Sequence, residues 1–180
     1  MTELLSVEIM KAHVAAIKTC IASKLTHPAL VLIYTGIDFV ASINRPAFKT
    51  DVDRQDFISW VDNFMDCSRL GVNGLDLYAA RCGVVHTYSP DSKLSRDGKA
   101  KRIMYAWGNK KPDDQNALLK KLGYSEVFVK LETLYDVFVQ GLVSFGDYLE
   151  KNPEMHELVR TRDRKLIGNF AEFLGIKDIE

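Results

Sequence analysis

The sequence predicts an all-α protein, built as a bundle of helices. Apolar residues recur at steps of three and four along most of the chain, which is the spacing of one face of a helix. The longest such stripe runs from Val127 to Leu149. The chain has 180 residues, of which 47% are hydrophobic, so it is long enough to bury one core. We therefore expect a single helical domain over residues 1–180, with additional long helices at its C-terminal end.

The first two helices are expected over residues 6–24 and 29–43. The first is amphipathic, and His27-Pro28 is interpreted as its stop. The second is apolar on nearly every side, which is typical of a helix in the middle of a bundle. It contains Asp38, and a charge in such a helix is costly unless it is paired. We therefore expect Asp38 to have a partner, either Arg81 or a backbone or hydroxyl donor.

The next two helices are separated by a break at residues 71–74, Gly-Val-Asn-Gly. The third is expected to begin near Thr50 or Asp51, where capping residues precede apolar residues at helical spacing. The fourth is expected from about residue 75 to residue 85 or 86. Residues 89–92, Ser-Pro-Asp-Ser, form a strong turn signal after it.

Residues 93–111 are predicted to be irregular, with a short extended segment at residues 103–107. A short helix then opens at Lys111-Pro112 and runs to about Leu122. The long helix of the apolar stripe follows. Asn152-Pro153 restarts the chain, and a final helix is expected to run toward Gly175.

Composition narrows the function classes. The 24 basic and 24 acidic residues cancel, so any nucleic-acid binding must depend on local charge. Three cysteines without close spacing predict neither a disulfide framework nor a metal site, and we expect no metal and no cofactor. The N-terminal residues have no signal-peptide pattern, and the apolar run at 29–43 is short for a membrane span. These features predict a cytoplasmic protein without a membrane segment.

Arg81 and His86 are the residues that we expect to carry chemistry. Arginine is always charged and binds phosphate oxygens through its forked donors, and histidine exchanges protons near neutral pH. The spacing alone carries little weight, since an Arg and a His this close arise readily by chance. On an ideal helix the two side chains would point about 140° apart. They converge only if His86 lies at a frayed helix end, or if a second copy of the chain supplies the partner groups.

The segment from Arg81 to Tyr88, Arg-Cys-Gly-Val-Val-His-Thr-Tyr, resembles the Arg-x4-His-x-Tyr signature of HEPN toxins from bacterial toxin–antitoxin pairs. The apolar helix with Asp38, and Gly98-Lys-Ala-Lys-Arg102, are similar to stand-alone bacterial HEPN-like proteins. The resemblance covers roughly residues 31–107. It implies a HEPN-like bundle and a homodimer that places two Arg-His pairs around one cleft and cleaves RNA without metal.

The resemblance also assigns roles to individual residues. It implies that Arg81 and His86 are catalytic and that Tyr88 and Asp38 support them. In the toxin family the matching tyrosine is modified with adenylate by a partner nucleotidyltransferase, so Tyr88 would be the silencing site. The expected function is a metal-independent endoribonuclease, a toxin or defence RNase.

Two alternatives remain open at this point. Cys82 stands where many HEPN nucleases have a polar residue, and this favours a non-catalytic HEPN module that binds nucleotide, RNA or a protein partner. A purely structural helical protein is the other. In that case Arg81 would form an ion pair with Asp76 or Asp38, His86 would cap a helix end, and Tyr88 would be a rim residue.

The segment from Lys93 to Lys111 carries seven positive charges against one acid. Lys99, Lys101 and Arg102 are the candidate RNA-binding residues, with Tyr105 and Trp107 stacking on bases. The alternative is a solvated loop whose aromatic pair docks on the core. The other histidines, His13, His27 and His156, are expected to be structural or solvated.

Overall fold

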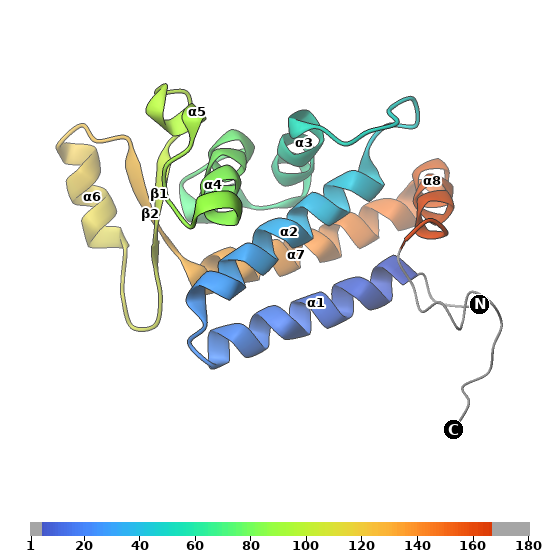
Figure 1. The fold of residues 1–180 in the computed structure, drawn as a ribbon, viewed down its shortest axis with the longest axis horizontal. Helices are drawn as coiled ribbons and strands as arrows, with labels where there is room; N and C mark the ends of the chain where they lie inside the picture. Colours follow the sequence, from blue (N-terminus) through green and yellow to red (C-terminus); the bar gives the residue numbers. More distant parts are fainter. Residues whose placement is uncertain (1–4, 167–180) are drawn as a thin grey trace.

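The computed structural model describes residues 5–166, and this part of the chain is mostly helical (Figure 1). Its helices are α1 (Leu5–Ala22), α2 (Thr26–Asn44), α3 (Arg54–Phe64), α4 (Gly74–Thr87), α5 (Lys93–Arg96), α6 (Asp113–Lys121), α7 (Leu131–Lys151) and α8 (Pro153–Asp163), with a short 3₁₀ helix at Cys67–Leu70. Two strands, β1 (Arg102–Ala106) and β2 (Glu126–Lys130), form a parallel sheet. The helical character is therefore confirmed, but the protein is mainly α and not strictly all-α.

The sheet corrects one prediction and confirms another. The extended segment expected at 103–107 is β1, in which Ile103 pairs with Val127 of β2. Val127 was expected to begin the long helix and instead lies in a strand. Val127 and Val129 are buried while Phe128 between them is half-exposed, which is the period of two that a strand requires. The helical stripe begins only after β2, at Leu131.

Helix α2 lies in the middle of the bundle, as its apolar composition predicts. It packs against α1, α3, α4, α7 and α8. A Cβ at Gly36 would lie 2.8 Å from the ring of Phe138, so this glycine allows α7 to approach closely. In residues 5–166, α2 is also the one helix whose length and composition would suit a membrane span, with half of that stretch buried inside the protein.

Several helix boundaries differ from the sequence prediction. Helix α2 begins at Thr26, so Pro28 lies in its first turn, where proline is tolerated, and does not separate two helices. Helix α3 begins later than expected, because Asp53 caps it and forms a capping box with Asp56. Helix α8 begins at Pro153 as expected; the rest of the helix predicted to run toward Gly175 lies outside the described residues.

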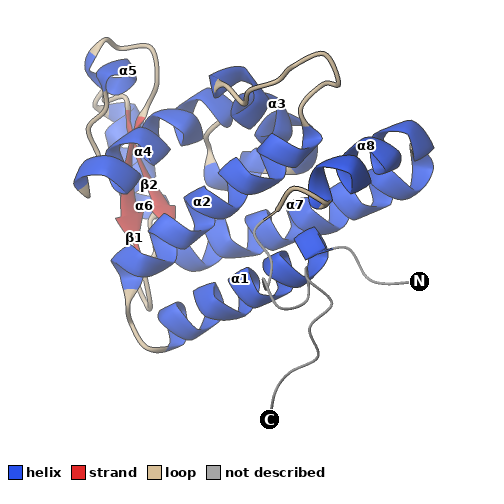
Figure 2. Cartoon of the chain, turned by 45° about the vertical axis from the view of Figure 1, so that its right-hand side comes forward, coloured by secondary structure: helices blue, strands red, loops and turns tan. Residues whose placement is uncertain are grey.

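The sheet and α6 lie at one end of the molecule and α8 lies at the other (Figures 1 and 2). The Asn116 side chain covers the outer edge of β2: its Nδ2 donates to the Phe128 carbonyl at 2.8 Å, and its Oδ1 accepts from the Phe128 N–H at 2.7 Å. Helix α6 thus supplies hydrogen-bond partners to backbone groups at the edge of β2 that would otherwise lack them. It also forms one wall of a cavity described below.

Candidate functional site

Helix α4 carries the Arg81 to Tyr88 segment, and both of its ends are fixed. At its start, Asn73 accepts from the Asp76 N–H and Asp76 accepts from the Asn73 N–H, forming a capping box. Asp76 also accepts from the Lys101 N–H at 2.8 Å, which ties the helix to the segment that leads into β1. Asp76 is therefore occupied and is not the ion-pair partner of Arg81.

The end of α4 turns back sharply on Gly83. Tyr88 adopts the left-handed conformation with φ 51°, and the Ser89 N–H donates to the Gly83 carbonyl at 3.3 Å. A Cβ at Gly83 would lie only 2.3 Å from the Ser89 carbonyl oxygen. The glycine inside the motif is therefore required by the chain reversal that follows His86. The sequence contained this signal, but the prediction did not use it.

Arg81 lies between Asp38 and His86. Its Nε and Nη2 each lie 2.8 Å from the same oxygen of Asp38, on α2. Its Nη1 lies 3.2 Å from Nε2 of His86. A guanidinium has only donors, so Nε2 accepts here and the imidazole proton sits on Nδ1. Of the two kinds of partner that the sequence left open for Asp38, Arg81 is the one observed.

The contact between Arg81 and His86 forms within one chain. Helix α4 ends at Thr87, so His86 lies in its last turn, and the long Arg81 side chain reaches it despite the five-residue spacing. Of the two geometries that would let these residues converge, the one at the helix end is observed. His86 is exposed, whereas Arg81 is half-buried.

Burial and charge act in opposite directions on this pair. Burial raises the pKa of Asp38 above its ordinary value, and the hydrogen bond and charge of Arg81 offset only part of that rise. For Arg81, burial lowers the pKa, but Asp38 and Cys82 outweigh it, so the net pKa is raised. Arg81 is therefore a permanent cation. It is held by the Asp38 carboxylate, which burial makes harder to ionise.

Tyr88 follows this cluster in the sequence and has a different neighbour. Its side chain is 65% exposed, and its ring meets the His27 ring edge-on at a centroid distance of 6.1 Å. The structure thus brings Asp38, Arg81 and His86 into contact, and it places the Tyr88 ring against His27 instead. The hydroxyl-bearing ring of Tyr88 is accessible, as modification would require.

The three candidate RNA-binding residues have different surroundings. Lys99 is exposed and lies 4.0 Å from Asp97. Lys101 Nζ donates to the Gly71 carbonyl at 2.7 Å. Arg102 lies between two carboxylates, at 2.7 Å from Asp91 and 3.2 Å from Glu126, so its charge is neutralised locally.

The two candidate stacking residues, Tyr105 and Trp107, also differ in their surroundings. The Tyr105 hydroxyl hydrogen-bonds to that of the fully buried Tyr34, which fixes the ring against the core. Burial is also the main cause of the raised pKa of Tyr105. Trp107 is 47% exposed. The docked alternative thus holds for Tyr105, and only Trp107 presents a ring to solvent.

Two of the remaining histidines, and Cys67, have surroundings of their own. His13 hydrogen-bonds through Nε2 to the Leu32 carbonyl at 2.6 Å and is structural, as expected, and His156 is exposed. Burial raises the pKa of the Cys67 thiol to about 12. Within residues 5–166, no group of three His, Cys, Asp or Glu side chains is placed to hold a metal ion.

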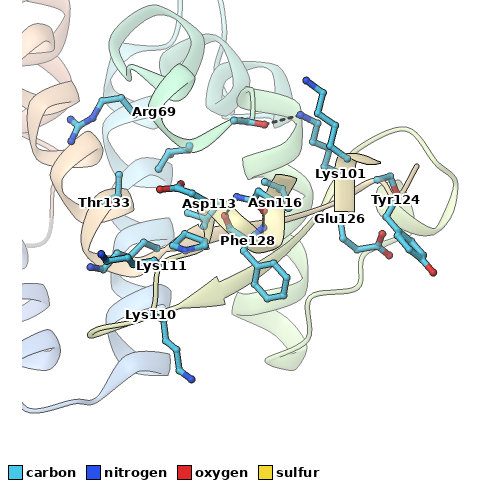
Figure 3. A pocket seen from close by; sticks show the side chains of 18 of the residues that line it. Arg69, Lys101, Lys110, Lys111, Asp113, Asn116, Tyr124, Glu126, Phe128 and Thr133 are labelled. Carbon is cyan, nitrogen blue, oxygen red and sulfur yellow. Dashed lines mark hydrogen bonds between the residues drawn. The ribbon is translucent and has the colours of Figure 1, made fainter. Parts of the chain in front are cut away.

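A large cavity, which the sequence did not predict, opens at the sheet end of the molecule (Figure 3). It measures about 960 Å³ and lies between α6, β2 and the 3₁₀ helix. Its lining includes six basic side chains, Arg69, Lys101, Lys110, Lys111, Lys120 and Lys130, and two acidic ones, Asp113 and Glu126. Glu126 is already paired with Arg102. Only Lys101 of these six had been selected from the sequence as a site residue, because the others are brought together by folding.

No family model, curated protein or solved structure matches this chain. We therefore base its function on the residues themselves.

Proposed function

We propose that this protein is a HEPN-like, metal-independent endoribonuclease. The observation that carries the proposal is the Arg81 guanidinium, held by Asp38 on one side and in contact with His86 on the other. A fixed cation beside an imidazole at an exposed helix end is the pair that cleavage through a ribose 2′-hydroxyl needs. The resemblance of the Arg81 to Tyr88 segment to HEPN toxins supports the same function.

Arg81 is suited to hold the scissile phosphate. A guanidinium carries five N–H donors, and the observed contacts to Asp38 and His86 use three of them. The two that remain can donate to the non-bridging oxygens of a phosphate. Because Asp38 fixes the guanidinium plane, little rotamer freedom is lost when the phosphate binds.

His86 is suited to move the proton. Its Nε2 accepts from Arg81 in the free protein, and the same lone pair can take the proton of the 2′-hydroxyl once Arg81 Nη1 donates to the phosphate instead. The 2′-oxygen then bonds to phosphorus, the bond to the 5′-oxygen breaks, and that oxygen receives a proton from an acid. The products are a 2′,3′-cyclic phosphate and a 5′-hydroxyl, and the reaction as written needs no oxidant or metal.

One copy of the cluster contains one imidazole, whereas the reaction uses a base and an acid. A homodimer would place a second His86 across the same cleft and divide the two roles. We therefore keep the homodimer as part of the proposal. A toxin or defence role in the cytoplasm, with a nucleotidyltransferase partner that modifies the exposed Tyr88, fits the same resemblance.

The second candidate function is a non-catalytic HEPN module that binds nucleotide, RNA or a protein. It is favoured by the ion pair itself, since a guanidinium engaged by Asp38 is also what a purely structural link between α2 and α4 looks like. Cys82, in place of a polar residue after Arg81, favours it as well. A solely structural helical protein would neither bind nor cleave RNA.

The test is cleavage of single-stranded RNA in EDTA by the wild type, Arg81→Ala, His86→Ala and His156→Ala. His156 is an exposed histidine on α8 and provides the matched control. We expect His156→Ala to match the wild type and His86→Ala to lose about 10²–10⁴-fold in rate, the usual contribution of a general acid or base. Cyclic-phosphate ends on the product would identify the reaction. Equal rates in all four proteins, each shown to be folded by circular dichroism, would refute the nuclease.

A further inference from the structure

Three hollows adjoin one another around the sheet end of the protein. The first, of about 160 Å³, lies between the end of α4 and β1 and is lined by His27, Tyr88 and Trp107 among others. The second, of about 380 Å³, shares Trp107 with the first and adds Phe128. The third is the basic cavity of about 960 Å³. It shares Lys110, Lys111 and Phe128 with the second.

Two aromatic rings, those of Tyr88 and Trp107, line the smallest of these hollows. Tyr88 is largely exposed and Trp107 about half-exposed. Trp107 lines a hollow on each side, so its ring stands where the two meet. The turn that carries it is fixed to α7, since the Gly108 N–H donates to Glu132 at 2.7 Å. The ring is thus presented by a tethered turn.

Positively charged side chains line the largest of the three hollows. Lys110 and Lys111 are exposed and stand three and four residues after Trp107 in the chain (Figure 3). Lys120 lines the same cavity from α6. The lining also holds two carboxylates, Asp113 and Glu126, and Glu126 is paired with Arg102. Six of the 24 basic side chains of the chain thus line this one cavity, against two acidic ones.

We propose that these three hollows form one path for single-stranded RNA, with bases stacked on Tyr88 and Trp107 and phosphates held by Lys110, Lys111 and Lys120. Sequence-tolerant single-strand binding combines these two features, namely aromatic platforms for bases and a basic groove for the backbone. The path differs from the one expected from sequence, because Arg102 is neutralised and Tyr105 is docked on the core.

The path begins at Tyr88, which is near the proposed catalytic residues in the sequence. Tyr88 follows His86 by two residues, so their Cα atoms are separated by no more than about 7 Å. Neither Arg81 nor His86 lines the small hollow, so RNA bound at Tyr88 would have to continue around the end of α4 to bring a phosphate to this pair. The point of cleavage on the path rests on the proposed function, whereas binding along the path does not.

The first test measures binding of a fluorescein-labelled single-stranded RNA of about a dozen nucleotides, a length within the usual site sizes, by anisotropy. All proteins carry His86→Ala so that cleavage does not interfere. We expect Lys110→Ala/Lys111→Ala to weaken binding and to reduce the slope of log affinity against log salt by about 1.4, since each single-strand phosphate contact contributes about 0.7. The control, Lys18→Ala/Lys151→Ala, removes the same charge from exposed sites outside the three hollows. Equal loss in the two double variants would overturn the path.

The second test uses Trp107 itself. The chain has two tryptophans, and Trp60 is fully buried, so quenching of the exposed emission by RNA reports on Trp107. We expect Trp107→Ala to weaken RNA binding roughly tenfold and Trp107→Phe to restore most of it, because a phenyl ring still stacks. Unchanged affinity in Trp107→Ala, with no quenching in the parent protein, would exclude the stacking platform.

These outcomes separate the path from the nuclease. If RNA binds as expected but the wild type does not cleave it, the catalytic proposal fails and the path stands. If the wild type cleaves RNA and neither Lys110→Ala/Lys111→Ala nor Trp107→Ala changes affinity, the path fails and the nuclease stands. The same measurement with single-stranded DNA shows whether the 2′-hydroxyl contributes to binding as well as to cleavage.

Discussion

Asp38 is the single charged residue in the apolar stretch of α2, and its position decides the orientation of Arg81. Both guanidinium contacts go to one oxygen of this carboxylate. Burial raises the pKa of Asp38 despite the adjacent cation, so its ionisation costs more in the folded protein than in the unfolded chain. A residue that stabilises the fold poorly yet positions a candidate catalytic cation is better explained by function than by stability.

We therefore expect Asp38→Asn to separate stability from activity. The free energy of unfolding at neutral pH, measured with urea, should change by less than about 1 kcal/mol, the range of partly exposed ion pairs. RNA cleavage should fall markedly, because Arg81 loses its anchor. Asp147→Asn, which removes an exposed carboxylate on α7, is the control. A large loss of stability with normal activity in the folded fraction would show that the Asp38–Arg81 pair is structural.

The pH dependence of the same variant has a defined sign. Because the pKa of Asp38 is raised above its ordinary 3.8 in the folded state, the folded protein takes up this proton before the unfolded chain as pH falls. The wild type gains stability from that proton uptake and Asp38→Asn does not. The stability of the variant relative to the wild type should thus decline between neutral pH and about pH 4, as followed by urea titrations. The opposite trend would mean that the pKa of Asp38 in the folded protein lies below its ordinary value.

At the scale of the element, the end of α4 depends on Gly83. Its missing Cβ leaves room for the Ser89 carbonyl, and this reversal sets the positions of His86 and Tyr88 at the surface. The glycine therefore belongs to the site geometry, although it carries no reactive group.

Gly83→Ala should destabilise the protein by about 1–3 kcal/mol, the usual cost of overpacking, and should reduce cleavage in the fraction that remains folded. Gly146→Ala is the matched control, since a Cβ there meets nothing within 4 Å. It should raise stability by about 0.5–1 kcal/mol, because alanine favours a helix over glycine. Thermal and urea unfolding measure both. Similar stability changes in the two variants would contradict the close approach at Gly83.

The α7 region shows how an element can be predicted well in one part and wrongly in another. From Leu131 onward the stripe is local and helical. Its first residues pair with β1, 24 positions earlier in the chain, and that partner is not visible in a window of neighbouring residues. The alternation of Val127, Phe128 and Val129 was compatible with a strand, but the continuous stripe outweighed it in the sequence.

At the scale of the whole molecule, the single imidazole of each cluster makes the proposed nuclease depend on a second copy. Sedimentation gives the concentration at which the dimer dissociates. We expect the activity per chain to fall when the protein is diluted below that concentration. A variant that weakens the dimer should act in the same way as dilution. Constant activity per chain in a demonstrated monomer would mean that one Arg81–His86 pair is sufficient, with the second proton supplied by another group.

The sequence by itself determined the helical architecture, the central place of α2, and the need of Asp38 for a partner, whereas the structure identified that partner as Arg81. Each of the three features that the sequence determined follows from local periodicity or from the cost of one unpaired charge in an apolar helix. Only the tertiary structure decided that Arg81 reaches His86 within one chain, that Arg102 and Tyr105 are occupied, and that Lys110, Lys111 and Lys120 line one basic cavity. Those outcomes depend on distances between residues far apart in the chain, which packing sets and composition does not.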